Sequence, residues 1–439
     1  MTELNIDHWW QPFTNVRAFR NNPRMFTRAE GCFLYDDKGR DVLDITAGLW
    51  CVGLGHARAE VADAIREQSM TLDYAPPFQF GNPTTFQFAE KLAQHAPDEL
   101  SRIFFTNSGS ESVDSAIKIA FNYQIARGKP AKTRMISRQR GYHGINVGGT
   151  SLQGLPNNRK GFPVLDTVDF LDDTLDLDQS AFSRGLPEVG ADKAEQLKTI
   201  IDERGADNIC AVIVEPVVGA GGMVPPPAGY LHRIREICDE ADILLIFDEV
   251  VTGFGRTGSP FAAQTFGVIP DIMTTAKAIN GGTIPMGGVF IRPEIQQAIF
   301  DAAPTTMPEL MHGNTYSGSP VAAAAGLAAF KIFEREGLLT RASGPIGAYW
   351  ESALHSLRDI DHIIDIRNCG LLGAVTFKSN AEKYPAGAGV AVHNKCFENG
   401  LLARGVGDGM VMSPPLTISE SEIDLFIERY RKSIIDVFG

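Results

Sequence analysis

The sequence lacks paired cysteines, long apolar runs and a basic leader. Its six cysteines are scattered without C-x-x-C spacing, which argues against a disulfide framework or a zinc site and favours a reducing compartment, here the cytoplasm. It contains no run of 18 apolar residues, so we expect no membrane span. The opening residues, MTELNIDHWWQPF, lack the basic and apolar regions of a signal peptide.

Basic residues are also too few to favour a polyanionic partner. The chain has 40 Lys and Arg against 53 Asp and Glu, a net charge of −13, which argues against nucleic acid or an anionic membrane as partner. Internal repeats and low-complexity linkers are absent as well. The 439 residues that remain are enough for a large core and more than one domain.

Short apolar runs alternate with helical patterns between about residues 100 and 295. Near-continuous apolar strands separated by amphipathic helices are typical of an α/β fold, with a mostly parallel sheet covered on both faces. Further on, residues 361–377 indicate strands with helical patterns on either side, a smaller α+β unit. We predict a large domain at 60–320 and a small domain built from 1–59 and 321–439. The strand-like runs are RIFF (102–105), TRMISR (133–138), CAVIVEPV (210–217), ILLIFDEV (243–250) and GGVFI (287–291).

The stretch ILLIFDEVVTGFGRTG (243–258) contains the G-x-G-x-x-G pattern of dinucleotide-binding turns. That fingerprint needs its first glycine directly after the strand, a helix starting inside the motif and an acidic residue about 20 positions later. None of these conditions is met here, so we reject a nucleotide site. Asp248 remains at the carboxyl end of an apolar strand, where ligands of parallel sheets bind and where a protonated ring nitrogen would be a suitable partner.

Three other segments carry features that suit a phosphorylated, planar cofactor. Ser108 and Glu111 fit a capping box, which places a helix start, and hence an anion site, at Gly109. Tyr142 is flanked by glycines and can lie flat on a planar ligand. Lys277 follows an apolar segment, and a lysine in apolar surroundings favours the neutral amine that Schiff-base chemistry needs.

Each feature alone also has an ordinary structural explanation: a capped helix, a turn aromatic, a lysine that reaches water. Together they supply a phosphate cradle, a stacking ring, a carboxylate for a ring nitrogen and an imine-forming lysine. That combination predicts pyridoxal 5'-phosphate (PLP) as cofactor. His143 has no second histidine at ligand spacing nearby, so we predict no metal site.

Longer motifs resemble the class III, PLP-dependent aminotransferases. The resemblance covers nearly the whole chain and is closest to the ω-amino-acid:pyruvate (β-alanine:pyruvate) aminotransferases. It implies the PLP-dependent transferase fold type I. The motifs include FFTNSGSESVDSAIKIA, RGYHG, LLIFDEVVTGFGRTG, AKAINGGTIPMGGV, HGNTYSGSPVAAAAGLAA and RGVGDGMVMSPPL.

The resemblance implies a role for each matching residue. Lys277 forms the imine with PLP and moves the proton, and Asp248 keeps the pyridine nitrogen protonated. Tyr142 stacks on the ring, and Arg404 pairs the substrate carboxylate. The remaining implied site residues are Ser108, Gly109 and Ser110 at the phosphate, Thr315 reaching the phosphate from the neighbouring subunit, Trp50 and Phe13 in the substrate pocket, and Glu215 as the acid that pairs the arginine when no carboxylate is bound.

The implied reaction moves an amino group from an ω-amino acid or amine to pyruvate, giving L-alanine. Two alternatives stay open: a class III enzyme that uses 4-aminobutyrate with 2-oxoglutarate, and a PLP-dependent aminomutase. A site shared between subunits implies at least a homodimer, or a homotetramer. The sequence leaves the natural amino donor undefined.

Overall fold

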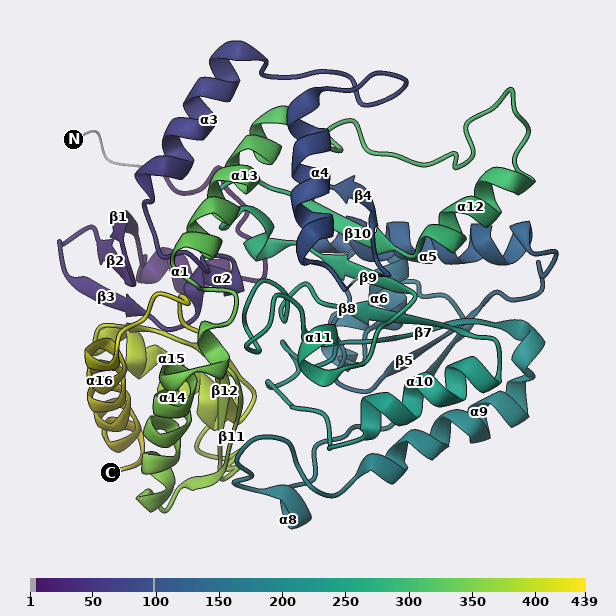
Figure 1. Cartoon of the computed structure of the whole chain (residues 1–439). Coiled ribbons are helices and arrows are strands. Elements are labelled where there is room, and N and C mark those ends of the chain that lie inside the picture. The colour runs from purple at the N-terminus through teal and green to yellow at the C-terminus, as the bar shows by residue number, and fades with distance from the viewer. Residues whose placement is uncertain (1–4, 98) are drawn as a thin grey trace.

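A seven-stranded sheet with helices on both faces forms the centre of the molecule, in a computed structural model that describes residues 5–97 and 99–439 (Figure 1). The order across the sheet is β4-β10-β9-β8-β7-β5-β6. All pairs from β9 to β6 are parallel, and only β10 runs against its neighbours, which confirms the predicted mostly parallel sheet. The strands are β4 (Arg102–Thr106), β5 (Arg134–Arg138), β6 (Val168–Leu171), β7 (Ile209–Val214), β8 (Leu244–Asp248), β9 (Ile272–Thr275) and β10 (Gly287–Ile291).

Apolar residues on both faces of each central strand explain why the sheet is covered twice. On β7, Ala211 and Ile213 belong to the core under one set of helices, whereas Val212 and Val214 belong to the core under the other. Alternate side chains of a strand point to opposite faces, so the apolar run buries itself on both sides. The first set is α5 (Gly109–Ala126), α6 (Val147–Leu152) and α12 (Pro293–Ala302), and the second is α9 (Gln196–Arg204), α10 (Tyr230–Glu240) and α11 (Ala262–Phe266).

Two four-stranded sheets lie beside the central one. In the first, β13 (Leu401–Leu402) pairs in parallel with β3 (Asp41–Asp44), so that Leu401 is opposite Leu43. This pairing joins an early segment of the chain to a late one, while the division into two domains stays a prediction. The other strands are β1 (Phe26–Glu30) and β2 (Phe33–Asp36) in the first sheet, and β11 (Ile363–Cys369), β12 (Leu372–Phe377), β15 (Gly409–Met412) and β14 (Arg404–Val406), in that order, in the second.

The remaining helices pack around these sheets. The helix predicted to start near Pro320 is α13 (Pro320–Arg335), and it packs closely on α4 (Pro83–His95), where a Cβ on Gly326 would overlap the ring of Phe88. The other helices are α1 (Val16–Asn21), α2 (Ala47–Trp50), α3 (Ala59–Thr71), α7 (Pro156–Arg159), α8 (Leu177–Ser180), α14 (Pro345–His355), α15 (Ala388–Glu398) and α16 (Glu420–Phe438).

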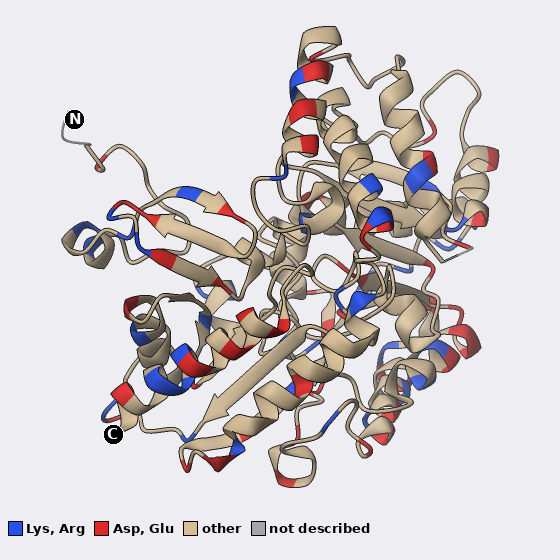
Figure 2. Cartoon of the chain, turned by 60° about the vertical axis from the view of Figure 1, so that its left-hand side comes forward, with Lys and Arg blue, Asp and Glu red and all other residues tan. Residues whose placement is uncertain are grey.

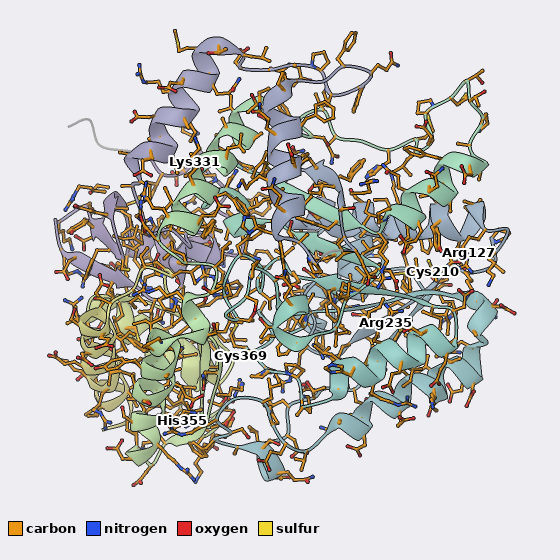
Figure 3. All side chains as sticks on the ribbon, viewed as in Figure 1. Arg127, Cys210, Arg235, Lys331, His355 and Cys369 are labelled. Atoms are coloured by element: carbon orange, nitrogen blue, oxygen red, sulfur yellow. The ribbon has the colours of Figure 1, made fainter. Side chains whose placement is uncertain are left out.

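Charged residues of both signs are interspersed along the outer helices rather than gathered into a basic patch in the view of Figure 2. None of the helices within residues 5–97 and 99–439 combines the length and apolar character that a bilayer crossing needs. All six cysteines are free thiols, and Cys210 and Cys369 lie in separate parts of the molecule (Figure 3).

Candidate active site

Seven of the predicted residues line one cavity of about 340 Å³ at the carboxyl edge of the central sheet. They come from five different connections, because β4, β5, β7, β8 and β9 all end at this edge. The carboxyl edge of such a sheet is where ligands bind, and here the loops bring together residues that are far apart in the sequence. The seven are Ser108, Gly109, Ser110, Tyr142, Glu215, Asp248 and Lys277.

The first turn of α5 forms one wall of this cavity. Ser108 is the N-cap, and its Oγ accepts a hydrogen bond from the Glu111 amide at 3.2 Å. The Glu111 carboxylate accepts from the Asn107 amide at 2.6 Å, one residue earlier than a capping box on Ser108 would require. The helix start therefore lies where predicted, and the amides of its first turn have no partners inside the helix, as suits an anion.

Gly109 allows this helix start to approach the strand that carries Asp248. A Cβ at position 109 would lie 2.9 Å from Val250 Cγ1 and 3.1 Å from its Cγ2, closer than carbon atoms approach without displacement. The Ser110 hydroxyl also accepts a hydrogen bond from the Ile145 amide at 3.1 Å, which fixes the loop that follows Tyr142 against the same turn.

Tyr142 and Glu215 are held together by backbone hydrogen bonds. The Tyr142 amide donates to Glu215 Oε1 at 2.9 Å, and the Gly219 amide donates to Oε2 at 2.8 Å. Burial raises the pKa of the Glu215 carboxyl, and Asp248 raises it further, while His143 and the two amides oppose the shift. In this structure, both Glu215 carboxylate oxygens accept hydrogen bonds from backbone amides.

Asp248 is buried and fixed by His143, a residue for which the sequence predicts no role. His143 Nδ1 donates to Asp248 Oδ2 at 2.8 Å, and the Val250 amide donates to Oδ1 at 3.2 Å. Each carboxylate oxygen of Asp248 therefore accepts one hydrogen bond, and the side chain is held in one orientation. In the sequence, the feature that could have indicated a role for His143 is its position next to Tyr142 in the motif RGYHG.

Lys277 begins a short 3-10 turn (Lys277–Asn280) directly after β9 and has a left-handed backbone, φ 48°. Burial lowers the pKa of its amine, Arg404 lowers it further, and Cys51, Asp248 and Glu215 oppose the shift. The Lys277 Nζ lies 5.5 Å from the centre of the Trp50 ring. The half-buried amine therefore occupies a site that favours its neutral, nucleophilic form.

Trp50 connects this lysine to Arg404. Trp50 is 5% exposed, and the Arg404 guanidinium carbon lies 5.3 Å from its ring centre. Burial lowers the pKa of Arg404, and Tyr142 opposes that shift. Within residues 5–97 and 99–439, Arg404 has no ion-pair partner, so its guanidinium is available to an anionic ligand.

Four predicted residues do not line the cavity: Trp50 and Arg404 lie next to it, as described above, whereas Phe13 and Thr315 are exposed. Phe13 is 76% exposed, and Thr315 is exposed in the turn before α13, where its carbonyl accepts a hydrogen bond from Tyr74 Oη at 3.0 Å. The single chain thus tests neither residue's role, and both stay predictions.

The GFGRTG segment (253–258) does not have the strand–turn–helix structure of a dinucleotide-binding site. Residues 253–258 form turns after β8, and the next helix, α11, begins only at Ala262 and has five residues. Arg256 is buried, and its Nη1 donates to the Pro414 carbonyl. In the part of the chain that the structure describes, no group of three His, Cys, Asp or Glu residues is suited to hold a metal ion.

Comparisons with known proteins agree on one family. The family model described as "Aminotransferase class-III" matches residues 16–434. An "Omega-aminotransferase" of Caulobacter vibrioides is 48% identical over 98% of this chain and 97% of its own length, and a "Beta-alanine--pyruvate aminotransferase" of Pseudomonas aeruginosa is 45% identical over 96% and 94%. A solved ω-transaminase from Pseudomonas jessenii, in complex with PMP, superposes with a TM-score of 0.91 at 36% identity, covering 98% of this chain and 96% of that one.

Proposed function

Because the chain belongs to the class III aminotransferase family, we propose that it moves an amino group from an ω-amino acid, such as β-alanine, or from an amine to pyruvate. Membership confirms the resemblance seen in the motifs, and the likeness to solved ω-transaminases confirms fold type I. The proposal rests above all on one observation: a lysine, a buried carboxylate and an open helix start line the same cavity.

The residues present fit PLP. The amides of the first turn of α5 suit a phosphate, Gly109 lets this turn lie close to Val250 beside Asp248, and Asp248 suits a protonated pyridine nitrogen. When bound, PLP supplies an aldehyde that condenses with amines and a ring that accepts electrons from the substrate carbon.

The chain supplies the remaining functions. Ser108, Gly109 and Ser110 would hold the phosphate of PLP, and Tyr142 would stack on its ring. Asp248, fixed by His143, keeps the ring nitrogen protonated. The amine of Lys277, with its lowered pKa, takes a proton from the substrate and returns it as general base and acid. The half-buried position of Lys277 limits exchange of that proton with water.

Arg404 and Trp50 would let one pocket accept two unlike substrates. Arg404 has the fork geometry to bind pyruvate's carboxylate through two parallel hydrogen bonds. The Trp50 ring lies close to both Arg404 and Lys277 and offers an apolar surface to a donor whose reacting end has no carboxylate. Glu215 is the candidate counter-ion for Arg404 in that second case, and Phe13 remains a candidate for the pocket of an assembled enzyme.

A second copy of the chain would complete the site. Thr315 lies outside its own cavity, on a surface that exposes several large apolar side chains, which is typical of an interaction surface. The Tyr74 and Tyr316 rings on this surface pack edge to face, with their ring centres 5.8 Å apart. We propose a homodimer, or a homotetramer built from it, in which Thr315 reaches the neighbour's phosphate, and we propose a cytoplasmic location for a protein with six free thiols. The exposed apolar residues are Tyr74, Phe78, Phe80, Phe86, Met307, Met311 and Tyr316.

The alternatives differ in what they do with nitrogen. An enzyme of the 4-aminobutyrate type would prefer 2-oxoglutarate, whose second carboxylate needs a second cation near the pocket mouth. Among the described residues that line the cavity, none is an arginine, and Arg404 is the arginine that lies next to it, against Trp50. An aminomutase would return the nitrogen to the same molecule.

A donor panel tests the proposal. The purified holoenzyme is incubated with 15N-labelled β-alanine, 4-aminobutyrate or a carboxylate-free amine, together with pyruvate or 2-oxoglutarate. We expect 15N-alanine from pyruvate with β-alanine and with the amine. Faster formation of labelled glutamate would support the 4-aminobutyrate type, and label confined to the donor skeleton would support the aminomutase.

A further inference from the structure

The segment 303–319 joins α12 to α13 without helix or strand, and it carries Thr315 (Figure 1, the green loop at the upper right). Such a long irregular segment needs specific anchors to hold one conformation. One anchor lies near its end, where Thr85 Oγ1 donates to the Gly318 carbonyl at 2.7 Å and Tyr74 Oη donates to the Thr315 carbonyl. The other anchor is His312.

His312 fixes the segment to α5. Its Nε2 lies 2.8 Å from Ser115 Oγ and its Nδ1 lies 3.3 Å from Lys118 Nζ, both on α5. Its ring also stacks on Phe104 of β4, with centres 5.5 Å apart and planes 9° from parallel. Three contacts from two different elements thus meet at one side chain, three residues before Thr315.

The packing just before His312 is incomplete, so the contacts of His312 contribute more to holding the segment. A cavity of about 190 Å³ lies between residues 309–310 and the side chains of α5, α12, β4 and β10. Leu310 packs against the core beside α5 and α12, but the cavity interrupts this apolar contact. Met311, next to His312, is 72% exposed and adds no burial on the other side.

The donors and acceptors define one protonation state. A lysine ammonium only donates, so His312 Nδ1 accepts from Lys118, and the proton of the neutral ring must be on Nε2, from which it donates to Ser115 Oγ. A second proton would have to enter at Nδ1. It would face the Lys118 ammonium and abolish that hydrogen bond.

The helix that receives His312 is the one that begins at the phosphate cradle. Ser115 is five residues from Ser110, about 8 Å along the helix axis. We propose that His312 is a positioning residue: by fixing segment 303–319 to α5, it holds Thr315 at the phosphate of the neighbouring subunit and links the two cofactor sites through one helix. This inference rests on the proposed shared active site.

The linkage makes cofactor retention sensitive to acid. Burial, and then Lys118, lower the pKa of His312 from 6.5, whereas Glu111 on the same helix opposes the shift; the packed residue of β4, Phe104, is uncharged. Because the pKa in the assembled state lies below the free value, the contribution of His312 is complete above about pH 6.5. It is lost as the pH falls through the lowered pKa.

Four variants test the inference. His312→Ala and Ser115→Ala break the contact from its two sides, Thr315→Ala removes the residue that is positioned, and His312→Gln keeps a donor and an acceptor but cannot titrate. Thr305→Ala, at an exposed residue of the same segment that is not part of the apolar surface, is the control. The release of PLP from each holoenzyme into excess PLP-trapping protein is followed by absorbance at pH 8 and pH 5.5, and sedimentation reports the assembly state.

We expect His312→Ala, Ser115→Ala and Thr315→Ala each to speed PLP release roughly fivefold at pH 8, the effect of losing one hydrogen bond. The double variant His312→Ala/Thr315→Ala should be no worse than the worse single one. His312→Gln should retain PLP at pH 8 and lose the wild type's faster release at pH 5.5.

Failure of the inference can be distinguished from failure of the shared site. Faster release in Thr315→Ala with unchanged release in Ser115→Ala would overturn the role of His312 and leave the shared site intact. Unchanged release in Thr315→Ala would overturn both. If His312→Ala does not fold, Ser115→Ala decides alone, since an alanine is readily accommodated in a helix.

Discussion

At the scale of single residues, Lys277 combines a strained backbone with a depressed amine pKa. A non-glycine residue in the left-handed region costs about 1–3 kcal/mol and persists where the surroundings demand it. Here the turn directs the side chain from the end of β9 into the cavity. The sequence indicated an amine in apolar surroundings, but it contained no signal for this backbone conformation.

Replacing Lys277 with alanine should abolish transamination while leaving the fold intact. We expect kcat to fall by roughly 10³-fold or more, because the general acid and base is lost. Borohydride reduction followed by peptide mapping should no longer attach PLP to this position. Lys331→Ala, an exposed lysine on α13 (Figure 3), is the control and should behave as the wild type. Normal turnover by Lys277→Ala would refute the assignment.

Arg404→Ala should weaken the binding of pyruvate far more than the binding of a carboxylate-free amine. A charge-assisted pair is worth about 1.5–3 kcal/mol, so we expect KM for pyruvate to rise roughly 10- to 100-fold. Arg404→Lys should lie between, since an ammonium keeps the charge and loses the fork geometry. Steady-state kinetics with both substrates varied gives the two values. An equal rise in KM for the amine and for pyruvate would contradict a specific role of Arg404 in binding the pyruvate carboxylate.

His143→Ala should lower kcat without removing PLP. The hydrogen bond to the Asp248 carboxylate would be lost, and a bond to a charged group is worth about 1.5–3 kcal/mol, which corresponds to roughly 10- to 100-fold. His143→Asn can still donate and should recover part of the rate. His355→Asn is the control: this histidine is also buried, but it is the last residue of α14, far from the cavity (Figure 3). A wild-type kcat in His143→Ala would leave His143 a purely structural role.

At the scale of elements, the start of α5 was predictable and its tight approach to β8 was not. Ser108 and Glu111 marked the N-terminus from local spacing alone. The contact between Gly109 and Val250 depends on how two distant strands align, which a sequence does not reveal. The direction of β10 was not predictable either. Its sequence predicts one more apolar strand, but the strand runs antiparallel to both of its neighbours.

Gly109→Ala should reduce PLP affinity with a small effect on stability. Its backbone is helical, so alanine is allowed there, but the added carbon would meet Val250 Cγ1 at 2.9 Å and push the helix start away. We expect roughly tenfold weaker PLP binding in a fluorescence titration of the apoenzyme, the equivalent of about 1.4 kcal/mol. Gly128→Ala, at the far end of α5 in open space, should cost stability and leave PLP affinity unchanged.

At the scale of the whole molecule, Arg367 braces the C-terminal sheet against the active-site edge. It lies on β11, where Nη1 donates to Asp365 and Nε donates to the Gly222 carbonyl at 3.1 Å, in the loop that follows Glu215. That loop also supplies the Gly219 amide to Glu215. The geometry of Glu215 therefore depends on a side chain far away in sequence.

Arg367→Met should be strongly destabilising, because it leaves Asp365 buried without its cation. Breaking one side of a buried pair costs about 3–5 kcal/mol. Replacing both residues, as in Asp365→Asn/Arg367→Met, should recover much of the loss. Thermal unfolding of both holo variants measures the difference. A single variant as stable as the wild type would show that solvent reaches the pair.

The features that the sequence predicts depend on residues close together in the chain, whereas the features that it misses depend on contacts between distant segments. The strand that ends at Asp248 and the helix at Pro320 follow from short patterns and are confirmed. The stack of Arg404 on Trp50 and the bond between His143 and Asp248 join segments from different parts of the fold. The role of Thr315 depends on a second copy of the chain, to which its predicted partner belongs, and it stays a prediction.

The parallel pairing of β3 with β13 has a consequence for how the polypeptide is made. Residues 41–44 leave the ribosome early, and the strand that covers their edge, residues 401–402, is translated only when synthesis is almost finished. Until then, β3 exposes an unpaired edge, the kind of surface on which nascent chains associate with one another. This sheet can therefore mature only at the very end of translation, and protection of the growing chain, for example by a chaperone, should raise the yield of active protein.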